Sequence, residues 1–177
     1  MIYFTADPHF GHANIIKHCN RPFHSAAHMD SALTSNWNIR VKPEDEVYIL
    51  GDFTMRPAEE AHEYLTRLNG RKYFIRGNHD KFLNSFELYA DDFKWVKDYH
   101  VLKAFGYRFV LFHYPILEWD GFFRNSIHLY GHIHNNEIST GRAKAQGGQM
   151  FNVGVDVTGF VPVSINEVIK RSAEISL

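Results

Sequence analysis

Five short apolar runs mark the first three quarters of the chain, and polar residues follow each of them closely. The runs consist mainly of aromatic and β-branched residues and occupy positions 2–4, 47–50, 73–75, 109–112 and 127–130. Runs of this length and composition predict buried β-strands.

Helices are expected between these runs, where apolar residues recur at helical spacing. The expected segments are 14–19, 27–41, a stretch from Pro57 to about Gly70, and a last helix that follows Ser164. Ser164 and Glu167 have the spacing of a capping box, which marks a helix start. The segment 96–112 is expected to form two strands turned at Gly106, and 141–148 a loop or weak hairpin. This alternation alone indicates an α/β or α+β fold.

Carboxylate, imidazole and amide side chains follow the five runs. The candidate metal ligands are Asp7, His9, Asp52, Asn78, His113, His132 and His134. Ligands of open α/β sheets bind outside the carboxyl ends of the strands, so we expect these side chains to meet. Carboxylate together with imidazole suits Mn, Fe, Zn, Co or Ni better than Ca or Mg. Seven ligands exceed the need of one tetrahedral ion, whereas two ions sharing a bridging carboxylate would use them all.

In this order the blocks resemble the motifs of the calcineurin-like metallophosphoesterase superfamily. Its pattern runs D-x-H, GD, GNH followed by D or E, H, and GHxH, and the chain matches it from Asp7 to His134. The chain looks most like the small bacterial and phage members, on the basis of segments 7–12, 113–115 and 152–156. The resemblance implies one domain over residues 1–177 with an α/β fold, a four-layer αββα sandwich of two mixed β-sheets flanked by helices.

The resemblance also implies how the ligands divide between two ions. The implied ligands of one ion are Asp7, His9 and His134, and those of the other are Asn78, His113 and His132. Asp52 would bridge the two ions, and a metal-bridging hydroxide would be the nucleophile. The expected cofactors are two divalent transition-metal ions, from among Mn, Fe, Zn and Ni, with Mn favoured.

His79 would be the acid of the reaction or a residue that orients the phosphate. It neighbours the ligand Asn78, and Asp80 follows closely enough to help orient its imidazole. General acids of this kind protonate a departing oxygen.

Further substrate contacts are expected from His12, Arg21 and Arg56. An arginine can hold phosphate oxygens with two parallel N–H groups, although each of these arginines also fits a solvated surface position. His12 equally fits a helix-capping or surface role. An aromatic wall for a base or aryl group could come from Tyr114, Trp119 and Phe122, which core packing explains about as well.

Composition narrows the partners and the compartment. The 177 residues suffice for one hydrophobic core. The net charge of −1 (19 Lys and Arg against 20 Asp and Glu) argues against electrostatic binding to long nucleic acid or to a membrane surface. A small phosphate ester, a nucleotide or a short oligonucleotide remains as partner. Cys19 is the only cysteine, which excludes an intramolecular disulfide. No leader or membrane-length apolar run stands out, so a soluble cytoplasmic protein is expected.

The expected function is metal-dependent hydrolysis of phosphate esters, with phosphodiesters favoured over monoesters. A phosphomonoesterase is one alternative, and a catalytically silent metal-binding or scaffold protein of the same fold is another. An oxygenase with a 2-His-1-carboxylate centre would need fewer ligands than this chain offers. Two ions per chain together with esterase activity would separate hydrolysis from these alternatives.

Overall fold

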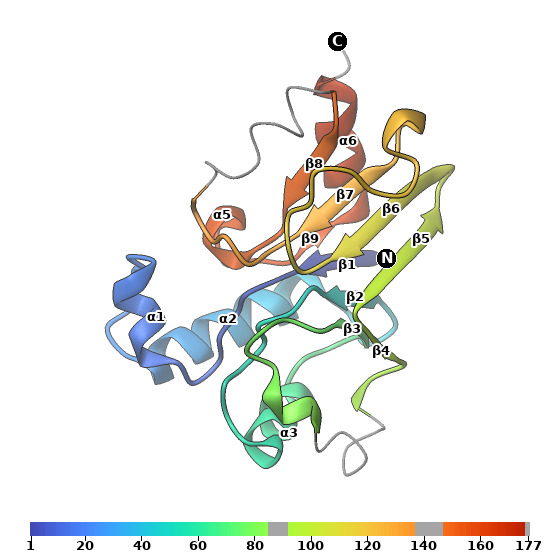
Figure 1. Cartoon of the computed structure of the whole chain (residues 1–177). Coiled ribbons are helices and arrows are strands. Elements are labelled where there is room, and N and C mark those ends of the chain that lie inside the picture. The colour runs from blue at the N-terminus through green and yellow to red at the C-terminus, as the bar shows by residue number, and fades with distance from the viewer. Residues whose placement is uncertain (85–91, 137–146, 176–177) are drawn as a thin grey trace.

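A five-stranded mixed sheet forms the first of two layers of β-structure. We describe residues 1–84, 92–136 and 147–175 of a computed structural model (Figure 1). The strand order is β4-β3-β2-β1-β9, with β1 to β4 parallel and β9 antiparallel to β1. The strands are β1 (Ile2–Thr5), β2 (Glu46–Ile49), β3 (Arg71–Ile75), β4 (Val96–Lys97) and β9 (Val163–Ser164).

The second layer is a four-stranded mixed sheet of order β5-β6-β7-β8. Its strands are β5 (Tyr99–Ala104), β6 (Tyr107–Phe112), β7 (Ile127–Tyr130) and β8 (Gln149–Asn152). β5 and β6 are antiparallel, and the remaining pairs are parallel. The turn between β5 and β6 places Phe105 and Gly106 at φ angles of 51° and 80°, which suits the tight turn expected at Gly106.

The hydrophobic core between the two sheets joins their facing side chains. Phe4 of β1 packs against Phe109 of β6 with ring centroids 5.8 Å apart. Ile165 and Val168 of helix α6 (Ile165–Ile175) belong to the same cluster, so this helix closes one end of the core. Ser164 accepts a hydrogen bond from the Glu167 amide, and the Glu167 carboxylate accepts one from the Ser164 amide, as the capping box predicts.

Two helices cover the outer face of the first sheet. They are α2 (Ala26–Arg40) and α3 (Ala58–Thr66), and α1 (Ala13–His18) lies near one end of α2 (Figure 1). α2 buries Met29, Leu33 and Trp37, which recur four residues apart, as a helix over this segment requires. The expected helix boundaries are therefore correct to within one or two residues, apart from the end of α3, which the prediction placed closer to Gly70.

A short irregular segment covers the outer face of the second sheet. Trp119 and Phe122 pack there against Val110, Tyr130 and Met150. Phe122 begins the short 3-10 helix η2 (Phe122–Arg124). The two-sheet α/β architecture flanked by helices agrees with the expected sandwich. The loop or hairpin expected at 141–148 lies largely outside the described residues, and within them no helix is long and apolar enough to span a membrane.

The carboxyl ends of the parallel strands of both sheets meet at one edge. Backbone hydrogen bonds join the sheets there, from the Ala6 amide to the Val153 carbonyl at 3.1 Å and from the Val155 amide to the Ala6 carbonyl at 3.0 Å. The short helix α5 (Val155–Thr158) begins at this junction. Polar residues that follow β1, β2 and β3 are thereby brought against residues that follow β6, β7 and β8.

Candidate metal centre

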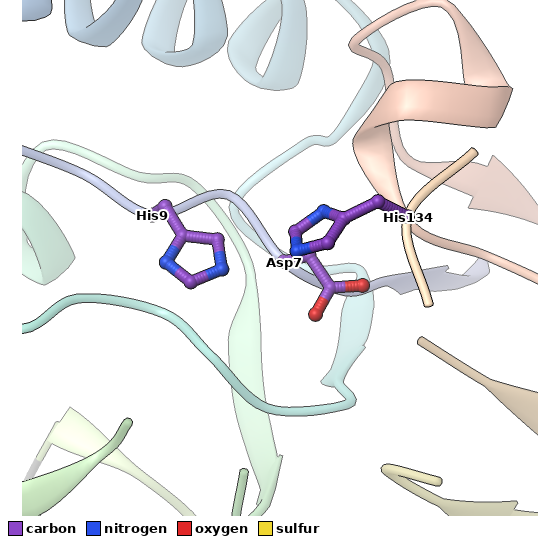
Figure 2. A group of neighbouring side chains, drawn as sticks. All are labelled: Asp7, His9 and His134. Atoms are coloured by element: carbon purple, nitrogen blue, oxygen red, sulfur yellow. The ribbon is translucent and has the colours of Figure 1, made fainter. Parts of the chain in front are cut away.

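The first group of candidate ligands combines two loops. Asp7 and His9 follow β1, and His134 follows β7; one ligand atom from each lies within 4.8 Å of the others. Asp7 and His9 are 0% and 1% exposed. Figure 2 shows the three side chains next to one another, with the two histidines coming from separate segments of the chain.

The second group lies beside the first. Asp52, His113 and His132 also place one ligand atom each within 4.8 Å of one another. Asn78 adds its amide oxygen, Oδ1, which is 3.1 Å from His113 Nε2 and 3.0 Å from His132 Nδ1. Four of the seven expected ligands therefore converge at this second point.

Asp52 connects the two groups. Its Oδ2 atom lies 3.7 Å from Nε2 of His9 and 3.5 Å from Nε2 of His113. The other carboxylate oxygen, Oδ1, accepts a hydrogen bond from the backbone amide of His79 at 2.9 Å. This geometry puts one carboxylate between an imidazole of each group, as a bridging ligand requires.

The donor atoms of the cluster are arranged as ligands of cations would be. Both ring nitrogens of His9 are buried without a hydrogen-bond partner, although buried polar atoms normally have one. His113 Nδ1 lies 2.8 Å from the Leu50 carbonyl, which can only accept, so Nδ1 carries the proton. In the neutral ring Nε2 then presents a lone pair to the oxygens of Asp52 and Asn78. Such converging lone pairs suit bound divalent ions.

Burial dominates the electrostatics of this cluster. It raises the pKa of Asp7 to about 7 and lowers the pKa of His9 to about 3. Burial also acts to raise the pKa of Asp52, but without a metal ion the hydrogen bond and charge of a protonated His113 outweigh it and bring the value to about 2. A cation in the cluster would provide the positive charge that the buried carboxylates lack.

Five of the expected ligands have left-handed backbone conformations. Their φ angles are 56° at Asp7, 53° at His9, 53° at Asp52, 69° at His132 and 50° at His134. Non-glycine residues rarely adopt this region, and such strain concentrates at functional sites. Gly77 allows the loops to come this close, because a Cβ atom there would lie 2.4 Å from Asp52 Oδ1.

Comparison with known proteins identifies relatives over nearly the whole chain. Protein MJ1445 of Methanocaldococcus jannaschii, described as uncharacterized, is 38% identical over 175 residues, which are 96% of this chain and 89% of that protein. The crystal structure of AQ665 from Aquifex aeolicus, a protein of unknown function, is 30% identical with a TM-score of 0.78 and covers 97% of this chain and 98% of that one. The chain belongs to their family.

A shorter similarity extends to a phage. The Gene 66 protein of Mycobacterium phage D29 is 37% identical over 83 residues, 45% of this chain and 40% of that protein. No family model matches the chain. The two mixed sheets and the two His/Asp groups at their joined edge agree with the fold and the ligand grouping that the resemblance to calcineurin-like metallophosphoesterases implies.

Asp80 occupies a structural position between the ligand loops, which differs from the position expected for it. Its carboxylate, 2% exposed, accepts hydrogen bonds from the amides of Asp52 and Phe53 at 2.8 Å and of Gly77 at 2.7 Å. It therefore ties the two ligand loops together and does not orient the His79 imidazole. The ring of His79 lies 5.6 Å from that of His9, between centroids.

Arg21 is placed differently from the expected phosphate contact. Its side chain is 0% exposed and pairs with Asp156. Its five N–H groups are directed to Asp156, to the Asp7 and Pro8 carbonyls and to the Met29 sulfur. An arginine with all its donors engaged in the interior cannot also bind a phosphate, so this expectation is wrong.

His12 lies beside the first donor group, and Arg56 lines the same pocket as His12. The His12 ring is 5.4 Å from that of His9, between centroids, and Arg56 donates to the Gly11 carbonyl at 2.8 Å. Both line an open pocket of about 290 Å³ together with Phe10, Gly11, Ala13, Asn14 and Met55. Arg56 is half exposed and approaches Glu60 at 3.6 Å.

The expected aromatic wall is only partly present. The Tyr114 ring lies 4.6 Å from that of His132 and 4.8 Å from that of His113, between centroids. Trp119 and Phe122 instead belong to the buried cluster on the outer face of the second sheet. Core packing, the alternative explanation, accounts for these two residues.

Asp156 is the important residue of the centre that sequence reasoning missed. It lies 2.7 Å from His134 Nδ1. The sequence could have indicated Asp156, because this acidic residue follows strand β8 (149–152) closely, as the candidate ligands follow the other strands. Cys19, His134 and Asp156 form a third cluster of donors, but it shares His134 with the first, and Arg21 already pairs with Asp156.

Proposed function

We propose that this chain is a dinuclear-metal-dependent phosphoesterase that hydrolyses phosphodiesters in preference to monoesters. The observation that carries the proposal is the position of the Asp52 carboxylate between His9 and His113, with one donor group on either side. Asp7, His9 and His134 would hold one ion, and Asn78, His113 and His132 the other. Two divalent ions would supply charge neutralisation of the phosphate and a water acidic enough to react at neutral pH.

The protein's own contribution would be to fix the ligands and to supply a proton. His79 is half-buried beside His9, and its amide donates to the bridging carboxylate of Asp52 at 2.9 Å. The loop that carries this histidine is thus anchored to the centre while its imidazole is not engaged as a ligand. In this proposal the His79 imidazole donates a proton to the departing ester oxygen.

The pocket beside His9 would receive the organic part of the substrate. Its lining combines the Met55 side chain, 51% exposed, with the polar groups of His12, Asn14 and Arg56. A volume of about 290 Å³ suits one planar group of modest size, such as a nucleobase or an aryl ring.

The distribution of cations favours diesters. Arg21 is committed to Asp156, and Arg56 is close to Glu60, so the described residues place little unpaired positive side-chain charge near the centre. A monoester carries one more negative charge than a diester near neutral pH and would gain less from this surface.

Comparison of two nitrophenyl substrates tests the proposal. The protein is first stripped with a chelator and then assayed with Mn²⁺, Ni²⁺, Zn²⁺ or Mg²⁺ on bis(p-nitrophenyl) phosphate and on p-nitrophenyl phosphate. We expect metal-dependent hydrolysis, fastest with a transition metal such as Mn²⁺ and faster for the diester. Metal binding without hydrolysis of either ester would contradict an enzymatic role, and a clear monoester preference would contradict the substrate class.

A further inference from the structure

The region behind the first donor group contains a buried ion pair. Nε of Arg21 lies 2.8 Å from Oδ1 of Asp156, and Nη2 lies 2.8 Å from Oδ2. The two side chains are 0% and 3% exposed. This parallel, two-point pairing is the most directional contact between an arginine and a carboxylate. The pair is therefore fixed in orientation as well as in position.

The remaining donors of Arg21 hold the loop that carries two of the ligands. Nη2 donates to the Asp7 carbonyl and Nη1 to the Pro8 carbonyl, both at 2.8 Å. Asp7 and Pro8 immediately precede His9, and the φ angles of Asp7 and His9 are 56° and 53°. One guanidinium group thus stabilises the strained backbone between these two ligands.

Asp156 orients the third ligand of the same group. Its Oδ2 atom lies 2.7 Å from Nδ1 of His134. The carboxylate accepts here, so Nδ1 carries the proton and Nε2 of the neutral ring keeps its lone pair. Such carboxylate–histidine pairs fix the tautomer and the ring orientation of metal-binding histidines. Asn152 supports the same segment by donating to the His134 carbonyl at 2.7 Å.

The second donor group is oriented by different contacts. The Leu50 carbonyl accepts from His113 Nδ1 at 2.8 Å, and the Asp80 carboxylate accepts from the Gly77 amide, next to Asn78, at 2.7 Å. Among the contacts described for Arg21 and Asp156, none involves a side chain of this second group.

We propose that Arg21 and Asp156 act together as positioning residues for the first ion alone. Arg21 fixes the backbone of the Asp7–His9 loop, and Asp156 fixes the tautomer of His134. Arg21 and Asp156 are 135 positions apart in the sequence. This inference rests on the two-ion centre of the proposed function. It assigns to Arg21 a role in metal affinity in place of substrate binding.

Metal titration of two conservative variants tests this role. In Asp156→Asn and Arg21→Lys we expect the affinity for the first ion to fall by about 10–100-fold, as is usual when such outer contacts are lost. The affinity for the second ion should change by less than about threefold. Calorimetric titration with Mn²⁺ would measure both steps, and His9→Ala and Asn78→Ala would show which step belongs to which ion.

A second ion pair in the chain provides matched controls. Arg40 and Glu167 pair at 2.7 Å between α2 and α6. Arg40→Lys and Glu167→Gln make the same chemical changes away from the centre and should leave both binding steps unchanged. Equal weakening of both steps in the Arg21 and Asp156 variants, or no weakening of either, would overturn the proposal.

A readout on the unaltered protein removes dependence on the folding of any variant. Nitrogen NMR of the metal-free wild-type protein should show neutral His134 as the tautomer protonated on Nδ1. A wild-type His134 protonated on Nε2 would refute the role of Asp156. An absence of phosphoesterase activity would refute the proposed function but would leave the tautomer and the binding steps as independent tests.

Discussion

The buried carboxylate of Asp80 accepts a hydrogen bond from the backbone amide of Asp52 at 2.8 Å. The same carboxylate accepts from the Phe53 and Gly77 amides, so three buried donors depend on one side chain. Two loops that carry ligands, one after β2 and one after β3, are held together by this carboxylate.

Replacement of Asp80 should therefore affect stability and metal binding together. We expect Asp80→Ala to lower the free energy of unfolding by about 3 kcal/mol or more, because buried donors left without a partner cost about 1–3 kcal/mol each. Asp80→Asn keeps one acceptor oxygen and should cost less. Urea unfolding measures the effect, and Asp98→Ala, whose parent side chain is 84% exposed, is the control. Unchanged stability in Asp80→Ala would contradict this role.

The two histidines of the GHxH block should serve different ions. His134 belongs to the first donor group and His132 to the second. We expect His132→Ala and His134→Ala each to lose one ion per chain, and chelation of the wild-type protein to remove both and abolish hydrolysis. Elemental analysis after dialysis measures the occupancy. Full activity after thorough chelation, or loss of both ions in each single variant, would contradict this division.

His79 should matter more for poor leaving groups than for good ones. Its imidazole lies beside His9, whereas the ligand next to it in the sequence is Asn78. We expect His79→Ala to keep both ions and to slow hydrolysis of a nucleoside or alkyl ester by about 10²–10⁴-fold. The loss on a nitrophenyl ester should be smaller, because nitrophenolate departs without protonation.

The matched control for this comparison is His24→Ala, since His24 is exposed. Equal losses on both esters would assign His79 to phosphate binding instead of proton transfer. Loss of one ion would make His79 a ligand.

His128 should make the stability of the protein depend on pH. The side chain is 0% exposed, its ring nitrogens lie 3.1 Å from the Val110 and Tyr114 carbonyls, and burial lowers its pKa from 6.5 to about 4. Between these values the unfolded chain binds the proton more readily than the folded one, so stability falls as the pH falls. By pH 5 the contribution lost is about 2 kcal/mol.

Unfolding of chelated protein in urea at pH 7 and pH 5 measures this effect. His128→Gln removes the titrating group but keeps a polar side chain, so the variant should lose less stability between the two pH values than the wild type. Equal losses in both proteins would show that His128 is not the group responsible.

The sequence predicted which candidate ligands would meet at the joined edge of the sheets, because these residues follow strands directly. The strand runs are recognisable from local composition, and the parallel arrangement of β1 to β3 and of β6 to β8 brings their ends together. The helix that buries Met29, Leu33 and Trp37 was predictable for the same reason, since its pattern lies within one short segment. Local patterns and motif order therefore sufficed for both.

Contacts between distant segments were not predictable in this way. Arg21 was expected at the substrate, but its partner Asp156 lies in the short helix α5, which only the joining of the two sheets brings near. Trp119 and Phe122 are aromatic, and aromatic residues suit a substrate-binding surface as well as a hydrophobic core. Only the position of the second sheet shows that these two residues belong to a core. The two-residue strands β4 and β9 are too short to leave a periodic pattern.

The left-handed backbone at Asp7, His9, Asp52, His132 and His134 sets stability and activity against each other. Each of these residues holds a conformation that glycine would adopt at lower energy. If randomly mutated variants are selected only for thermal stability, in the absence of metal, glycine should become enriched at these ligand positions. The selected variants should be more stable but inactive. Retention of aspartate and histidine at these five positions would then require selection for the activity itself.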